Sequence, residues 1–296
     1  MKKIGFIDLD TSHPRSFVKR INAMDSFKVT GVFDRSRVKG SKETVDFSEE
    51  FGARVFDSPS KLAEACDGVM VLSADWETHF SDISIVLNAG KACYCDKPLV
   101  GSLQELNALA EIAEKSEAPF LAGSGWRWND VVSKIAKDIE GKRISDALFC
   151  APSDRFYYGI HGVEFILGIF GPGIESVKVE AKTEQATIVS LRHKRGMTIS
   201  LILETDFSLS RFNVFSVDGQ RRSITLDGDD VHNGICENFA KCLLTGRSPA
   251  TFATYAESVK IMLAIERSLI SGNVERPSDL EPSFSVSSAD FMRSYQ

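Results

Sequence analysis

Three side chains that could do chemistry lie close together near the N-terminus, in the stretch IGFIDLDTSH. Asp8 and Asp10 follow an apolar run directly, and His13 comes three residues after Asp10. Two acids at this spacing could act as a nucleophile and an acid, or could cap a following helix without doing chemistry. A protonated His13 would offset part of their charge. The residues alone leave these uses open.

The elements that would position these residues are strands alternating with helices over about the first 120 residues. Apolar strands are expected at 3–9, 27–34, 54–58, 68–74, 91–99 and 119–125. Helical spacing is expected at 14–24, 59–66, 79–90 and 102–117. Ser102 and Glu105 form a capping box at the start of the last helix. Repeated alternation of this kind predicts a doubly wound parallel sheet with helices on both faces.

The pattern changes after residue 124. Strand-like runs at 174–183, 185–206 and 211–228 contain turns at 194–196 and 218–219, and helices are expected around them. We therefore predict an α/β protein with two domains. Residues 1–123 would form the doubly wound domain. Residues 124–296 would form an α+β domain with a mostly antiparallel sheet.

Composition excludes several classes of partner. The net charge of −6 over 296 residues argues against nucleic acid, and no apolar run approaches the length of a membrane span. The six cysteines form no CxxC pair, which predicts neither a metal site nor a disulfide framework. Reduced thiols favour a cytoplasmic protein.

Three segments carry a resemblance to a known family. They are HFSDISIVLNAGKACYCDKPLV (79–100), YYGIHGVEFILGIFG (157–171) and the late helical pair at 236–272. In their order and spacing the chain resembles the glucose–fructose oxidoreductase / inositol dehydrogenase (Gfo/Idh/MocA) family of nicotinamide-dependent oxidoreductases, over nearly its full length. Asp96 stands where the family's Glu-Lys-Pro signature has Glu. Tyr157, Gly159, His161 and Glu164 stand at the four places of its Asp-x-Gly-x-His-x-x-Asp segment.

The resemblance implies a set of catalytic residues. Lys97 would donate to the reacting oxygen, and His161 would exchange that proton with Tyr157 nearby. Tyr157 replaces an aspartate, so it gives no fixed negative charge to orient an imidazolium. Trp126 and Arg127, at the expected domain join, would bind the substrate together with Lys97 and His161.

The resemblance also implies NAD or NADP as cofactor, with residues 1–123 as a Rossmann-type dinucleotide-binding domain and residues 124–296 for substrate binding and oligomerisation. Asp34, about 20 residues past the first turn, would hold the adenosine ribose, and Asp96 the nicotinamide ribose. Arg35 and Arg37 could instead attract a 2′-phosphate. The full set expected at the cofactor is Asp8, Asp10, Thr11, Ser12, His13, Asp34, Arg35, Ala74, Trp76, His79, Asp96 and Lys97.

The main departure from the family lies in the opening stretch. Asp8, Asp10 and His13 stand where the three glycines of G-x-G-x-x-G would be. A carboxylate about 5 Å from a pyrophosphate costs about 3 kcal/mol at an effective dielectric near 20, roughly a hundredfold in affinity. The cost falls if Asp10, Thr11 or Ser12 caps the next helix, or if the acids point away from the phosphates.

The expected function is therefore transfer of a hydride between a nicotinamide and a hydroxyl-bearing carbon of a sugar, inositol or related polyol. A homodimer or homotetramer would form through the C-terminal sheet. One alternative is a family member with weakened cofactor binding that acts as a sugar-binding or regulatory protein. Another is a phosphatase of the haloacid dehalogenase type that uses Asp8 and Asp10, with LDGDD (226–230) as its late magnesium aspartates.

Overall fold

The computed structural model describes residues 1–152, 156–205, 213–225 and 228–295, with the backbone alone at 228–230. The chain divides into two compact units. The first unit consists of Met1–Gly123, His232–Tyr255 and Ser287–Gln296, and the second of Ser124–Val231 and Ala256–Val286. The first join is at 123/124, whereas the sequence analysis predicts a single domain over residues 124–296.

Two late segments belong to the first unit because their aromatic side chains pack there. Helix α8 (Gly228–Thr245) places the Phe239 ring 6.5 Å from the ring of Tyr94, between ring centroids. Helix α10 (Ala289–Tyr295) places the Phe291 ring 5.6 Å from that of Trp76. A boundary drawn at one point of the sequence cannot describe such returns of the chain.

The first unit is built on six parallel strands in the order β3-β2-β1-β4-β5-β6. Their bounds are β1 (Lys2–Ile7), β2 (Phe27–Phe33), β3 (Arg54–Val55), β4 (Gly68–Val71), β5 (Ala92–Cys95) and β6 (Phe120–Ala122). Every residue of β4 and β5 is buried, as expected for a parallel sheet covered on both faces. The strand order is that of a dinucleotide-binding fold, in which ligands bind beyond the carboxyl ends of the strands. The predicted Rossmann-type sheet is confirmed.

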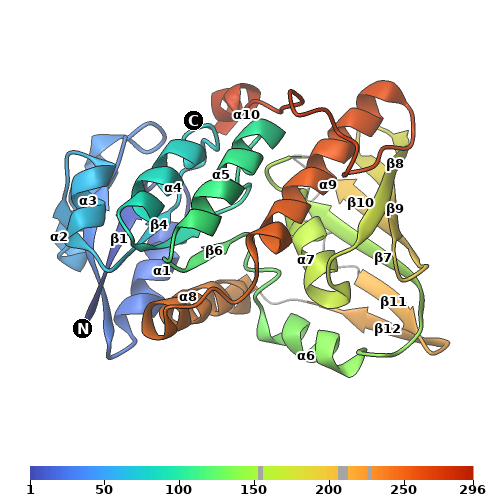
Figure 1. Cartoon of the computed structure of the whole chain (residues 1–296), viewed down its shortest axis with the longest axis horizontal. Coiled ribbons are helices and arrows are strands. Elements are labelled where there is room, and N and C mark those ends of the chain that lie inside the picture. The colour runs from blue at the N-terminus through green and yellow to red at the C-terminus, as the bar shows by residue number, and fades with distance from the viewer. Residues whose placement is uncertain (153–155, 206–212, 226–227, 296) are drawn as a thin grey trace. The chain divides into compact units, whose positions relative to one another are not determined.

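Helices cover both faces of this sheet. They are α1 (His13–Asn22), α2 (Gly40–Phe51), α3 (Pro59–Ala65), α4 (His79–Asn88) and α5 (Leu103–Lys115). Figure 1 shows α3, α4 and α5 along one face and α1 with α8 along the other. Ser102 caps α5 as predicted, since its Oγ accepts from Glu105 N at 3.2 Å, and the Glu105 carboxylate accepts from the Ser102 hydroxyl at 3.1 Å.

A pair of glycines lets α3 approach the sheet closely. Gly5 of β1 and Gly31 of β2 lie side by side in the ladder. A Cβ on Gly5 would lie 2.8 Å from Leu62 Cδ1, and one on Gly31 would lie 2.7 Å from the same atom. The Leu62 side chain therefore fills the space that two side chains of the strands would otherwise occupy.

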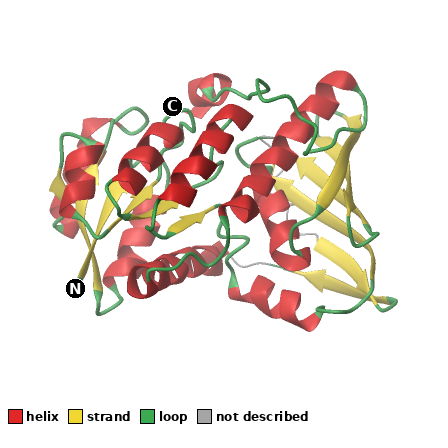
Figure 2. Ribbon diagram, viewed as in Figure 1, coloured by secondary structure: helices red, strands yellow, loops and turns green. Residues whose placement is uncertain are grey.

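The second unit contains a six-stranded sheet in the order β12-β11-β7-β10-β9-β8. Its strands are β7 (Ile144–Pro152), β8 (Ile174–Lys182), β9 (Ala186–His193), β10 (Thr198–Glu204), β11 (Asn213–Val217) and β12 (Gln220–Ile224). Only the β7–β10 pairing is parallel among the described ladders, so the predicted mostly antiparallel sheet is confirmed. Figure 2 shows α7 (Ile160–Phe170) and α9 (Phe252–Ser271) on one face of this sheet, and α6 (Asp130–Asp138) lies beside α7.

The cysteines and the helices bear on two further expectations. All six cysteines are free and buried. Among the residues that the structure describes, none of the helices combines the length and hydrophobicity needed to cross a membrane.

Candidate functional site

The loop after β1 turns its first acid toward the end of β2. Asp8 has a φ of 65°, in the left-handed region that glycine usually occupies and that aspartate tolerates. Its carboxylate accepts from Arg35 N at 2.8 Å and from Arg35 Nη1 at 2.5 Å. Arg35 Nη2 also donates to Asp82 at 2.7 Å. Burial, with further contributions from the carboxylates of Asp10 and Asp82, raises the pKa of Asp8 to about 7 despite the guanidinium.

The second acid of the loop is turned toward the end of β4. Asp10 Oδ2 accepts from Ala74 N at 2.9 Å and from Ser73 Oγ at 3.3 Å. Burial raises the pKa of Asp10, against the hydrogen bond from Ala74. Ser12 makes no side-chain cap on α1, so that suggested role is wrong. Thr11 Oγ1 instead accepts from His13 N at 3.1 Å.

The acid at the end of β2 is held by the protein itself. Asp34 Oδ1 accepts from Leu9 N at 3.3 Å and from Ser36 N at 3.1 Å. Asp34 Oδ2 accepts from Thr44 Oγ1 at 2.5 Å and, at a longer 3.4 Å, from Ser36 Oγ. These four bonds use the acceptor positions that a carboxylate offers. A ribose hydroxyl would have to replace the weak Ser36 bond.

Both nearby arginines are already paired with carboxylates. Arg35 bridges Asp8 and Asp82, and Arg37 Nη1 lies 2.8 Å from Asp75 Oδ2. The predicted attraction of a 2′-phosphate to these two side chains would have to compete with carboxylates already in contact.

A buried cluster forms just beyond β5. Asp96 is 1% exposed and Lys97 is 2% exposed. Asp96 Oδ1 accepts from Lys97 N at 2.8 Å and from the Tyr94 hydroxyl at 3.3 Å, and its Oδ2 lies 2.5 Å from His13 Nδ1. Burial favours the neutral acid, but His13 and the Lys97 charge outweigh it and hold the pKa of Asp96 well below its usual range. The structure thus brings together three of the predicted residues from two distant loops.

The other predicted cofactor residues of the first unit are buried. His79 lies fully inside, with Nδ1 2.9 Å from the Pro98 carbonyl oxygen and Nε2 3.0 Å from that of Ser73. It fixes the loop that carries Lys97 and Pro98. Trp76 is 1% exposed and packs on Phe291, so it covers the loop from inside the core.

In the second unit, His161 is held by a serine that the sequence did not single out. Ser124 Oγ lies 2.6 Å from His161 Nδ1. The Trp126 ring stands 5.5 Å from the His161 ring at an angle of 30°. This arrangement fixes the imidazole and leaves Nε2 as its second polar atom. Lys97 and His161 belong to different units.

Two further predicted residues of the second unit are buried. Arg127 Nε lies 2.7 Å from Glu164 Oε2, and both side chains are at most 5% exposed. Arg127 therefore has its charge compensated by the protein, and the expected position on a rim is wrong for its side chain. Tyr157 is 2% exposed, and its ring stands 4.8 Å from that of Tyr158.

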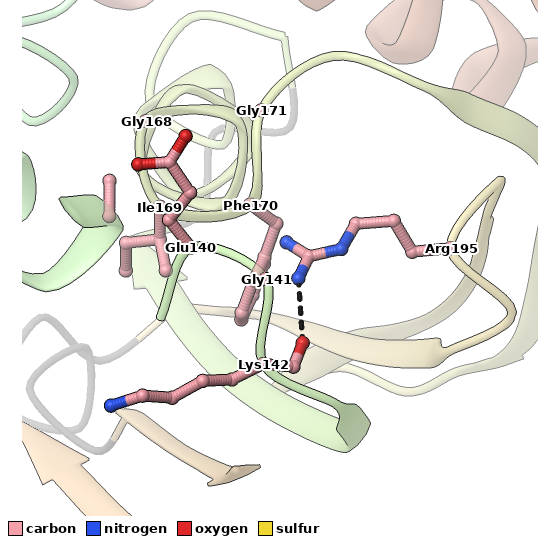
Figure 3. A pocket seen from close by; sticks show the side chains of 9 residues that line it. Glu140, Gly141, Lys142, Gly168, Ile169, Phe170, Gly171 and Arg195 are labelled. Atoms are coloured by element: carbon pink, nitrogen blue, oxygen red, sulfur yellow. Dashed lines mark hydrogen bonds between the residues drawn. The ribbon is translucent and has the colours of Figure 1, made fainter. Parts of the chain in front are cut away.

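A hollow of about 560 Å³ lies elsewhere in the second unit, and none of the predicted site residues lines it. Figure 3 shows the Arg195 guanidinium beside it, with Nη2 donating to the Lys142 carbonyl oxygen at 3.0 Å. Glu140, Ile169 and Phe170 line the rest. Across the described ranges, no group of three or more His, Cys, Asp or Glu side chains is arranged to hold a metal ion.

The residues present fit a dinucleotide at the carboxyl edge of the first sheet. Asp8 and Asp10 face protein donors, so the charge that the sequence sets against a pyrophosphate is partly compensated inside the protein. Asp96 and Lys97 offer a carboxylate and a cation beyond β5. His13 adds a second cation when it is protonated.

Comparison with known proteins supports this fit. Residues 5–124 match the model of an oxidoreductase family with an NAD-binding Rossmann fold, GFO_IDH_MocA. Glucose-6-phosphate 3-dehydrogenase of Bacillus subtilis is 24% identical over 148 residues, which are 50% of this chain and 41% of that protein. Inositol 2-dehydrogenase of Paracoccus denitrificans is 29% identical over 98 residues, 32% of this chain and 29% of that protein. The matches therefore span less than half of these relatives.

Solved structures match over much more of the chain. Scyllo-inositol dehydrogenase of Lactobacillus casei, with bound NAD(H) and scyllo-inositol, superposes with a TM-score of 0.81 at 13% identity, covering 94% of this chain and 100% of that one. An oxidoreductase of Agrobacterium radiobacter in complex with NAD+, L-tartaric acid and magnesium gives a TM-score of 0.78 at 12% identity, covering 94% and 98%. At such identities the likeness shows the shared two-part fold. Residues 5–124 of the chain are thus similar to the GFO_IDH_MocA oxidoreductase family, whose model describes an NAD-binding Rossmann fold.

Proposed function

We propose that the protein is an NAD(P)-dependent oxidoreductase that acts on a hydroxyl-bearing carbon of a sugar, inositol or related polyol. The observation that carries the proposal is the Asp96–Lys97 pair, buried at the carboxyl end of β5. A buried lysine next to a carboxylate at this edge of a parallel sheet is placed where ligands of the fold bind. The named relatives that oxidise sugars and inositol support the substrate class.

When bound, the nicotinamide supplies the position that accepts or releases hydride. The chain's own residues would do the rest. Lys97 would donate a hydrogen bond to the reacting oxygen and polarise it. His161, oriented by Ser124 through Nδ1, would hold or release the hydroxyl proton at Nε2 and exchange it with Tyr157. Trp126 would contact the substrate beside His161.

The arrangement around Asp34 favours NAD over NADP. Asp34 would accept an adenosine ribose hydroxyl in place of Ser36 Oγ, and a 2′-phosphate would meet this carboxylate. The positive charges of Arg35 and Arg37 are already paired with Asp82 and Asp75, respectively. Asp96 would hold the nicotinamide ribose, while His79 and Ala74 shape the loops around it.

The alternatives receive less support. A phosphatase would need Asp8 and Asp10 free for a phosphoester and a metal, but both carboxylates accept hydrogen bonds from the protein. The LDGDD segment proposed to complete such a site has side chains outside the described residues. Loss of cofactor binding remains the second candidate, since the glycine loop is replaced. A cytoplasmic homodimer or homotetramer through the C-terminal sheet stays a prediction, consistent with the 38% exposure of Ile188 on β9.

The test is a calorimetric titration of NADH and NADPH into the wild type and Lys97→Ala, followed by turnover assays on a panel of polyols. We expect NADH to bind more tightly than NADPH. Lys97→Ala should keep the NADH Kd within a few-fold and lower kcat by about a thousandfold, because it removes an electrostatic stabiliser of the reacting oxygen. Lys97→Ala with full turnover would remove Lys97 from the mechanism. Absence of NADH and NADPH binding would overturn the function.

A further inference from the structure

The side chain that replaces the third glycine of the loop is tied to the Lys97 cluster. His13 begins α1, where the dinucleotide fold places a pyrophosphate against the helix N-terminus. Its Nδ1 lies 2.5 Å from Asp96 Oδ2, across 83 residues of sequence. An ionised carboxylate only accepts hydrogen bonds, so Nδ1 carries the proton. The bond thereby leaves Nε2 as the ring's remaining polar atom.

The ring is held in place and is partly exposed. It stacks on Phe17 at 5.4 Å and 27°, and the His232 ring meets it edge-on at 4.8 Å. The His13 side chain is 17% exposed, against 2% for that of Asp96. Within the described part of the chain, Nε2 has no hydrogen-bond partner. A carboxylate that orients a histidine through Nδ1 also favours its protonated form.

We propose that His13 is a phosphate-binding residue of the cofactor site, oriented by Asp96, and that the dinucleotide takes up a proton at His13 when it binds. The inference rests on the proposed function and deepens it. A glycine-lined loop offers backbone N–H groups to the pyrophosphate. Here Nε2–H of an imidazolium would add a charge-assisted donor to the loop.

The charges around His13 agree with this role. Two titratable groups meet the ring itself, Asp96 from the exit of β5 and His232 from α8. On the neighbouring elements, Tyr94 donates to Asp96, Lys39 donates to the Thr11 carbonyl oxygen, Arg15 of α1 is paired with Glu43, and Asp10 accepts from Ala74 N. Asp96 contacts the ring directly and would balance the positive charge that the ring gains when the dinucleotide binds. The doubly charged pyrophosphate would then meet a ring that the buried Asp96 has already oriented.

The experiment measures proton uptake on binding. NADH is titrated calorimetrically from about pH 6 to about pH 9, in buffers that differ in ionisation enthalpy. We expect the wild type to take up a proton at neutral pH and to bind NADH roughly tenfold more tightly at the acidic end. A tenfold change in affinity is what a single group gives when its pKa changes by about one unit on binding. His13→Asn keeps a donor toward Asp96 but cannot titrate, and it should lose both the uptake and the tightening.

A matched control and an NMR readout keep the test independent of turnover. His232→Gln removes the neighbouring imidazole, which bonds Ser16 rather than Asp96, and should retain the proton uptake. In ring-labelled apo protein, Asp96→Asn should change the ring-nitrogen signals of His13, which report which nitrogen carries the proton, and leave those of His193, in the second unit, unmoved. Thermal unfolding checks that each variant is folded.

The outcomes separate the two proposals. Equal NADH affinity and equal proton uptake in the wild type and His13→Asn would overturn the role of His13. So would loss of the uptake in His232→Gln alone. NADH binding with the expected proton uptake but no turnover of any polyol would overturn the oxidoreductase proposal and support the binding role. Absence of dinucleotide binding would overturn both.

Discussion

Asp8 should make the protein less stable as the pH rises. Its carboxyl is 1% exposed and shares one guanidinium, that of Arg35, with Asp82. Because burial raises its pKa to about 7, the folded protein holds the proton more tightly than the unfolded chain, whose aspartates titrate near 3.8. Its contribution is therefore fully present below the unfolded pKa and is lost as the pH rises through about 7. Between about pH 5 and about pH 8.5 the loss amounts to about 3 kcal/mol.

Asp8→Gly is the perturbation that isolates this contribution. Glycine adopts the φ of 65° without strain and introduces no new donor toward Arg35, which keeps its bond to Asp82. Urea unfolding of both proteins across the pH range gives the difference in unfolding free energy. We expect that difference to change by about 3 kcal/mol, with the wild type losing relative stability toward high pH. A carboxyl-carbon NMR titration of Asp8 measures the same ionisation directly.

If the two unfolding free energies differ by a constant amount from about pH 5 to about pH 8.5, the Asp8 proton is not held by the fold and the reasoning fails. A carboxyl signal that titrates near pH 4 would show that the Arg35 guanidinium outweighs burial and the neighbouring acids. The ion pair would then stabilise the loop at neutral pH.

Two further predictions concern the second unit. Glu164→Gln should cost about 3 to 5 kcal/mol in urea unfolding, because it leaves the buried Arg127 charge uncompensated, and the apolar double variant Arg127→Met/Glu164→Leu should recover most of the loss. A double variant no more stable than the single one would contradict this. Gly125→Ala should cost about 3 kcal/mol or more, since its Cβ would lie 2.0 Å from the Val231 carbonyl oxygen. Gly141→Ala is the control, because Gly141 has a φ of 71° but open space around its Cβ position, and it should lower the free energy of unfolding by about 1 kcal/mol. Equal losses of stability in the two variants would refute the clash at Gly125.

Periodicity predicted the elements that carry a strong apolar signal. The strands of the first sheet, the helix capped by Ser102 and the antiparallel second sheet are present as expected. Two helices were missed. Helix α2 buries only Thr44 and Phe47 fully, so its sequence GSKETVDFSEEF has little apolar stripe to detect. Helix α10 is short and follows a polar, proline-containing stretch. Both are defined by packing more than by pattern.

The site was predictable in its residues but not in its contacts. Sequence and family resemblance together pick out Asp96, Lys97 and His13 separately. Their meeting depends on two loops that lie 83 residues apart, and no local pattern specifies such a meeting. Ser124, which holds His161, carried only a weak signal as a serine between two glycines. Arg127 illustrates the opposite error, because a charged residue at a domain join was expected on a surface and is paired inside the core.

The opening loop shows why a lost motif need not mean a lost turn. The first glycine of the motif does two things: it permits a left-handed backbone and leaves room beside the phosphates. Asp8 adopts the left-handed backbone, with a φ of 65°, and its side chain points toward Arg35. Asp10 is drawn away to Ala74 N in the same manner. The residues that replace the glycines therefore preserve the turn between β1 and α1, and His13 would add a side-chain donor beside that turn.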